Sequence, residues 1–147
     1  MSGERRLPTS KVAVVGVGFV GSAFAYSLMI HGIASEIVLI DIDEEKTQGE
    51  AMDLNHGLSF VRPVNIRAGG YPDCEGAAIV VISAGIAQKP GQSRLDLVRI
   101  NADIFRQIVP QVTEYNRDCI ILVATNPVDV MTYAALKLSG FPPSRVI

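Results

Sequence analysis

The chain has 147 residues, of which 48% are hydrophobic and 19% are charged, and its formal net charge at pH 7 is −2. A chain of this length buries roughly two-thirds of its unfolded surface, so we expect one domain. Because it has no basic excess and no apolar stretch of roughly 20 residues, neither nucleic acid nor a membrane is expected as a partner.

Short runs rich in Val and Ile alternate with longer stretches of helical spacing, which is typical of a parallel sheet with crossover helices. Residues 1–10 are polar and are predicted to be a flexible leader of a cytoplasmic protein. The further predicted elements, in chain order, are strand 12–15, helix 19–30 ended by Gly32, strand 36–41, helix 44–58, strand 64–67, strand 77–83, loop 86–94, helix 97–115, strand 119–124, helix 128–138 and the start of a sixth strand at 145–147.

This order of elements predicts a Rossmann-type doubly wound parallel sheet over residues 11–147, with strand order 3-2-1-4-5-6 and a sixth strand that is truncated or short. The strand after Pro63 is expected near an edge, since proline cannot donate a ladder hydrogen bond. The wholly apolar run 77–83 is expected in the middle of the sheet. Because a last strand of three residues has little to pair with, we expect that the polypeptide was cut at a domain boundary.

Three glycines, Gly16, Gly18 and Gly21, form a G-x-G-x-x-G pattern between the first predicted strand and its helix. Gly16 permits a tight turn, Gly18 leaves room for a pyrophosphate against the backbone, and Gly21 lets the helix and strand pack closely. Unpaired N–H groups and the positive end of the helix dipole then bind the phosphate charge. Glycine turns also occur for structural reasons alone, so the acid that follows the turn matters to the interpretation.

Asp41 closes the second predicted strand 20 residues after Gly21, where a dinucleotide site places an acid that accepts hydrogen bonds from the adenosine ribose. Asp43 adds a second negative charge, and no arginine nearby could receive a 2′-phosphate, so NAD is favoured over NADP. The alternative for Asp41 is a helix N-cap with Glu44 three residues on, a role that better fits Asp43.

The segments SAGIAQKPGQSRLDLVRIN and VATNPVDVMTYAALKLSGFPPSRVI closely resemble the lactate and malate dehydrogenase family, and the similarity extends from Lys11 onward. The resemblance implies that IAQKPGQSRLDL is a loop that closes over substrate, and that Arg94 is a catalytic residue that polarises the substrate carbonyl. A guanidinium suits this role because it stays charged and offers directed donors. The alternative for Arg94 is a solvated loop arginine.

The same resemblance implies that Gln88 separates the two branches of the family, since glutamine accompanies pyruvate and lactate whereas arginine accompanies oxaloacetate and malate. A buried arginine beside a methyl group would leave an unsatisfied charge, so Gln88 favours the pyruvate branch. Asn126 matches the asparagine that contacts substrate and cofactor, although Asn-Pro also favours a turn. The remaining cofactor residues that the resemblance implies are Val20, Lys46, Tyr71, Ala84 and Gly85, of which Lys46 could equally be a solvated lysine.

The family's proton donor is a histidine oriented by an aspartate, and those residues normally lie beyond the end of this chain. His31 and His56 are expected to be capping or exposed residues, and a second arginine for the substrate carboxylate is absent. The chain alone is therefore expected to bind NAD without turnover. The resemblance also implies a homotetrameric parent with the helix around residues 48–56 at a subunit interface, whereas the isolated chain could be monomeric or could self-associate.

Three alternatives to the NAD-binding domain of a pyruvate-branch enzyme stay open at this point. A malate dehydrogenase is the near rival, which Gln88 disfavours. A stand-alone NAD-binding module without catalysis would bind the cofactor and form no product, and a folding or assembly unit with a vestigial or engineered site would not bind NAD. Cys74 and Cys119 lie far apart in no metal-ligand spacing, so reduced, buried thiols and no metal site are expected.

Overall fold

A computed structural model describes residues 10–147, so residues 1–9 of the predicted leader lie outside the described part of the chain. Five parallel strands form one sheet in the order β3-β2-β1-β4-β5, which confirms the predicted topology. The strands are β1 (Lys11–Val15), β2 (Glu36–Ile40), β3 (Asn65–Ala68), β4 (Ile79–Ile82) and β5 (Ile120–Val123). As expected, β3 lies at an edge and β4 lies inside the sheet.

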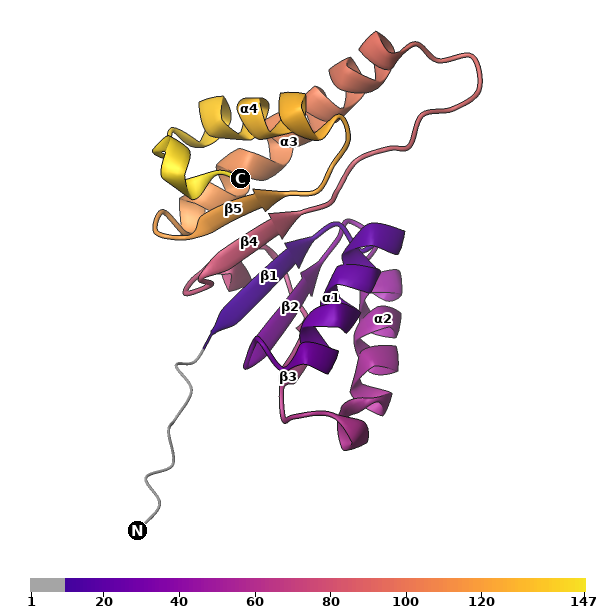
Figure 1. Ribbon diagram of the computed structural model, residues 1–147, viewed down its shortest axis with the longest axis vertical. Helices are drawn as coiled ribbons and strands as arrows, with labels where there is room; N and C mark the ends of the chain where they lie inside the picture. Colours follow the sequence, from indigo (N-terminus) through magenta and orange to yellow (C-terminus); the bar gives the residue numbers. More distant parts are fainter. Residues whose placement is uncertain (1–9) are drawn as a thin grey trace.

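Helices cover both faces of the sheet, α1 and α2 on one face and α3 and α4 on the other (Figure 1). They are α1 (Phe19–His31), α2 (Glu44–His56), α3 (Arg94–Tyr115) and α4 (Val128–Ser139), with short 3-10 turns at Leu58–Phe60, Tyr71–Cys74 and Pro143–Arg145. No helix within residues 10–147 is both long enough and apolar enough to span a bilayer.

Alternation along β1 explains why the core has two halves. Val12 and Val14 pack with the buried residues of α1 and α2, whereas Ala13 and Val15 pack with those of α3 and α4. Successive side chains of a strand point to opposite faces, so a strand covered on both sides must be apolar throughout. The short Val-rich and Ile-rich runs of the sequence therefore became the central strands.

Most predicted strand and helix ends shift by one or two residues in the structure; β4, for example, starts at Ile79 rather than at residue 77. Three differences concern α2, α3 and the sixth strand. Helix α2 ends at His56, two residues early, because the chain passes through Gly57 into a 3-10 turn. Helix α3 begins at Arg94, three residues before the predicted start, because Ser93 and Asp96 form a capping box. The predicted sixth strand is reduced to one parallel bridge between Val146 and Ile121 beside β5.

Local capping fixes where α1 ends. Gly32 has φ 61°, in the left-handed region, and its N–H donates to the carbonyls of Leu28 and Met29, as expected for a glycine that terminates a helix. The chain can then reverse towards β2 while the carbonyls of Leu28 and Met29 stay paired. Both cysteines, Cys74 and Cys119, are free and buried, as predicted.

Candidate functional site

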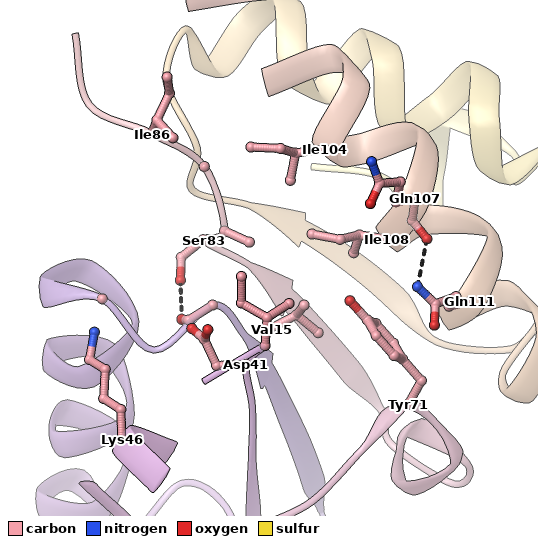
Figure 2. A pocket seen from close by; sticks show the side chains of 15 residues that line it. Val15, Asp41, Lys46, Tyr71, Ser83, Ile86, Ile104, Gln107, Ile108 and Gln111 are labelled. Atoms are coloured by element: carbon pink, nitrogen blue, oxygen red, sulfur yellow. Dashed lines mark hydrogen bonds between the residues drawn. The ribbon is translucent and has the colours of Figure 1, made fainter. Parts of the chain in front are cut away.

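A cleft of about 550 Å³ lies at the carboxyl edge of the sheet, where parallel sheets of this topology bind ligands (Figure 2). Its walls come from the turn after β1, the end of β2, the segment after β4 and one face of α3. The predicted cofactor residues that line it are Gly16, Gly18, Asp41, Lys46, Tyr71, Ala84 and Gly85.

The glycine turn after β1 has no space for side chains at two of its three glycines. Gly16 has φ 95°, and a Cβ there would lie 2.3 Å from the amide nitrogen of Ala84. A Cβ on Gly21 would lie 1.9 Å from the carbonyl oxygen of Gly16, so the helix and the turn are in direct backbone contact. A Cβ on Gly18 would meet no protein atom within 4 Å. The protein's own packing therefore does not demand glycine at position 18, and the space beside this residue is open to a ligand.

The N-terminus of α1 is open to an anion. Gly18 is its N-cap and provides no side-chain hydrogen bond, and the first turn of the helix contains no acidic residue. The N–H groups of the first turn and the positive end of the helix dipole therefore face the cleft, and the helix's own first turn has no carboxylate to compete for them. This arrangement fits the pyrophosphate of a dinucleotide.

Asp41 links the end of β2 to the glycine turn. One of its carboxylate oxygens accepts a hydrogen bond of 2.6 Å from the backbone N–H of Val17, and the other accepts one of 3.2 Å from the N–H of Asp43. These bonds orient the carboxylate, and its remaining lone pairs can accept from ribose hydroxyls. The N-cap of α2 is Asp43, whose side chain accepts from the N–H of Lys46, so the capping role falls on the residue predicted for it.

The wall opposite Asp41 comes partly from residues that the sequence analysis did not identify. Ile104, Gln107, Ile108 and Gln111 of α3 line the cleft, and Figure 2 shows Tyr71 next to Ile108 on this side. Their spacing of three and four residues was a visible signal, but helical core positions have the same spacing. Burial raises the pKa of the Tyr71 hydroxyl, with smaller contributions from Cys74 and Asp41, so this group stays neutral at physiological pH.

Ser83 was also missed, although its side chain holds the glycine turn. Its hydroxyl donates a hydrogen bond of 2.7 Å to the carbonyl oxygen of Gly16, and the dashed line at Ser83 in Figure 2 marks this bond. Three other predicted cofactor residues lie outside the lining of this cleft. Gly21 is buried behind the turn, Val20 is about half exposed in the first turn of α1, and Asn126 lines a separate cavity.

That second cavity, of about 350 Å³, contains all the predicted substrate residues. Gln88 comes from the loop after β4, Arg94 comes from the start of α3, and Asn126 comes from the turn after β5. Ile86 lines both cavities, so this cavity, named the substrate pocket after the residues predicted for it, lies beside the cofactor cleft. The topology thus brings together residues up to 38 positions apart in the sequence.

Arg94 is the first residue of α3 rather than a residue within the loop, and its side chain is exposed. Within residues 10–147, it forms no ion pair, and it is the one charged residue in the lining of the substrate pocket. A cation in a first turn opposes the helix dipole, so this position costs stability. Gln88 donates a hydrogen bond of 2.9 Å to the carbonyl oxygen of Gln92, which folds the loop tip back on itself.

Both histidines lie away from these cavities. His31 is in the last turn of α1, where its Nδ1 lies 3.0 Å from the carbonyl oxygen of Ser27, and His56 is in the last turn of α2. In a doubly wound sheet the helices run antiparallel to the strands, so helix C-termini lie at the edge opposite the cleft. Both side chains are exposed, in agreement with the prediction that they are capping or surface residues.

Comparison with known proteins gives a consistent result. Residues 10–147 match the family model described as lactate/malate dehydrogenase, NAD binding domain. The chain is 58% identical to the L-lactate dehydrogenase of Acetivibrio thermocellus over 137 residues, which cover 93% of this chain and 43% of that protein. It is also 58% identical to the L-lactate dehydrogenase of Clostridium botulinum (strain Hall) over 139 residues, covering 95% and 44%.

Solved structures show the same likeness. A lactate dehydrogenase enzyme from a Medee basin deep-sea metagenome library superposes with a TM-score of 0.90 at 50% identity, covering 96% of this chain and 45% of that one. The minor L-lactate dehydrogenase of Enterococcus mundtii, in a ligand-bound form, gives a TM-score of 0.89 at 47% identity, covering 94% and 44%. The chain spans less than half the length of these relatives.

Proposed function

This chain belongs to the lactate/malate dehydrogenase family, as its NAD-binding domain, and from this premise we propose that it is the cofactor half of an L-lactate dehydrogenase that reduces pyruvate with NADH. The observation that carries the proposal is the substrate pocket, in which Gln88, Arg94 and Asn126 meet beside the cofactor cleft. A cofactor module without catalysis would have no need for this second cavity.

The residues of the chain divide into those that hold the cofactor and those that contact the substrate. The glycine turn and the N-terminus of α1 bind the pyrophosphate, and Asp41 accepts from the adenosine ribose. Bound NADH supplies the hydride that the reaction requires. Arg94 donates to the substrate carbonyl oxygen, where negative charge grows as the carbonyl is reduced, and Asn126 donates to substrate and cofactor near the nicotinamide.

Gln88 decides the substrate branch. Within residues 10–147, only Arg94 is charged among the residues that line the substrate pocket, so this part of the chain places no second cation beside Gln88 for the extra carboxylate of oxaloacetate. A neutral amide is compatible with the methyl group of pyruvate, whereas a dicarboxylate would lose its water shell without a bidentate partner. Pyruvate therefore fits this pocket better.

The proton donor must come from outside this sequence, because His31 and His56 lie at the opposite edge of the sheet. The chain alone should therefore bind NADH and show no pyruvate reduction, and turnover by the chain alone would contradict this assignment. A homotetrameric parent enzyme and a cytoplasmic location are part of the same proposal, and both stay predictions.

A chimera tests the proposed substrate. This chain is fused to the part of the Acetivibrio thermocellus enzyme that lies beyond the matched segment, and NADH oxidation is followed with pyruvate and with oxaloacetate. We expect a clear preference for pyruvate that Gln88→Arg shifts towards oxaloacetate. The matched control is Gln92→Arg, which adds the same charge to the same loop outside the pocket lining. A folded chimera that prefers oxaloacetate, or equal shifts in both variants, would contradict the assignment of Gln88.

A further inference from the structure

A buried asparagine joins the two cavities, and the residues assigned to the site so far do not include it. Asn101 lies in α3 with none of its surface exposed. Its side-chain oxygen accepts a hydrogen bond of 2.9 Å from the backbone N–H of Ile86, and its side-chain nitrogen donates one of 2.8 Å to the carbonyl oxygen of Asn126. The same nitrogen lies 3.4 Å from the carbonyl oxygen of Ile86. One amide therefore contacts both strand exits.

The pairing with Ile86 replaces a missing sheet neighbour. After β4 ends at Ile82, the chain leaves the ladder, and its N–H and carbonyl groups need other partners. Asn101 offers one acceptor and one donor to the same residue, as the backbone of an adjacent strand would. Buried backbone groups without partners are costly, so removing this amide would leave the Ile86 segment free to move.

A second buried side chain reinforces the connection. The Thr125 hydroxyl donates a hydrogen bond of 2.8 Å to the carbonyl oxygen of Ala84, so the exits of β4 and β5 are tied at two successive points. Gly85 lies between them, and a Cβ there would meet the methyl group of Thr125 at 2.5 Å and the side-chain oxygen of Asn101 at 3.1 Å. The glycine is thus required by the two side chains that clamp this segment.

The clamped residues are the ones that the two cavities share or border. Ala84, Gly85 and Ile86 line the cofactor cleft, and Ile86 and Asn126 line the substrate pocket. We propose that Asn101 is a positioning residue that holds Ile86 and Asn126 at a fixed separation, so that cofactor and substrate are presented to each other in register. This inference rests on the proposed function, because it concerns the same site.

The rival explanation is that Asn101 only stabilises the fold, and the chain offers a matched control for it. Asn116 is also a buried amide, and its nitrogen donates to the carbonyl oxygens of Cys74 and Ala77 at 2.7 and 2.8 Å. Its side-chain oxygen accepts from two backbone N–H groups at 3.0 Å. It precedes β5, at the edge of the sheet away from both cavities. Because the two amides make similar buried hydrogen bonds at opposite edges of the sheet, the same substitution at both positions distinguishes a loss of stability from a loss of positioning.

The test compares Asn101→Asp with Asn116→Asp in the chain. Each substitution keeps the size of the side chain and puts an acceptor where a donor faced two carbonyl oxygens. Urea unfolding at several temperatures shows where both variants stay folded. The NADH affinity of each variant is then measured at such a temperature by calorimetry. We expect Asn101→Asp to weaken NADH binding by about tenfold, the effect of losing roughly one buried hydrogen bond. We expect Asn116→Asp to change the affinity less than twofold while it destabilises the chain comparably.

Amide hydrogen exchange at Ile86 provides a measurement that would not change if Asn101 only stabilised the fold. In the unaltered chain the Ile86 amide should exchange more slowly when NADH is bound, and Asn101→Asp should remove that protection while leaving the amides of β1 protected. If Asn101→Asp does not fold, the question is decided by two other measurements. One is the NADH affinity of Asn101→Ala, which leaves room for a bridging water, and the other is the Ile86 exchange of the unaltered chain.

The possible results separate the two proposals. Equal NADH affinities for the two aspartate variants, or Ile86 exchange that does not respond to NADH, would overturn the positioning role and leave the proposed function intact. Failure of the unaltered chain to bind NADH would overturn the proposed function, and the positioning role with it.

Discussion

Replacing Gly21 by alanine tests the packing of the glycine turn directly. The added Cβ would lie 1.9 Å from the carbonyl oxygen of Gly16 and 2.7 Å from the hydroxyl oxygen of Ser83. The first contact is with backbone, which cannot move aside as the end of a flexible side chain could. Overpacking of this kind costs about 1–3 kcal/mol, and displacing the Ser83 hydroxyl from Gly16 adds about 1 kcal/mol.

Alanine gains about 1 kcal/mol over glycine inside a helix, which offsets part of this cost. We therefore expect Gly21→Ala to lower the free energy of unfolding by about 1–3 kcal/mol. The matched control is Gly49→Ala in α2, where the added Cβ meets nothing within 4 Å. The same substitution there should raise the free energy of unfolding by about 0.5–1 kcal/mol.

Urea unfolding followed by circular dichroism measures both variants against the unaltered chain. Opposite signs for the two substitutions are the expected result. A Gly21→Ala variant as stable as the unaltered chain, or a Gly49→Ala variant that loses as much stability, would refute the account of the turn as a tight backbone contact.

Three further predictions concern the ligand sites and the acid stability. Gly18→Ala should change the free energy of unfolding by less than about 1 kcal/mol, since its Cβ meets no protein atom within 4 Å, yet calorimetry should show strongly weakened NADH binding; intact binding would remove the ligand role of Gly18. Arg94→Gln should leave the chain as stable or up to about 1 kcal/mol more stable by urea unfolding, because it removes a cation from a first turn, and should abolish turnover in the chimera; retained turnover would contradict its role. The hydrogen bond from Arg67 lowers the pKa of Asp73, so this pair contributes stability at neutral pH that is lost as the pH falls through the lowered pKa. Unfolding at pH 6 and pH 3 should therefore show a smaller acid loss in Asp73→Asn, by less than about 1 kcal/mol because the pair is partly exposed, and an unchanged acid loss would exclude this pair as its source.

The fold could be predicted from the sequence because β1, β2, β4 and β5 have apolar side chains packed on both faces. Runs such as 79–82 are therefore apolar throughout. The glycines at positions 16 and 32 mark turns in which the backbone has a positive φ, a conformation that favours glycine. The start of α3 was predicted three residues late. The S-x-x-D spacing of Ser93 and Asp96 is a capping-box signal, but it directly follows a polar segment with Gly and Pro, and the predicted loop was extended past it.

The site residues could be predicted where their sequence pattern is specific to a dinucleotide site. They could not be predicted where core residues of a helix have the same pattern. The glycine turn and Asp41 have a characteristic order and spacing. The α3 wall of Ile104 and Ile108 has the spacing of any buried helix face. Asn101 gave no signal at all, because its partners Ile86 and Asn126 lie 15 and 25 residues away and meet it only in the folded sheet.

Calorimetric titration of the chain with NADH and with NADPH tests the central claim most directly. The account predicts that NADH binds, and that NADPH binds much more weakly because its 2′-phosphate would meet the carboxylate of Asp41. Asp41→Asn should weaken NADH binding and narrow the difference between the two cofactors, while Asp53→Asn, which removes an exposed charge from α2, should alter neither. Absence of NADH binding, or equal affinity for both cofactors in the unaltered chain, would contradict the account.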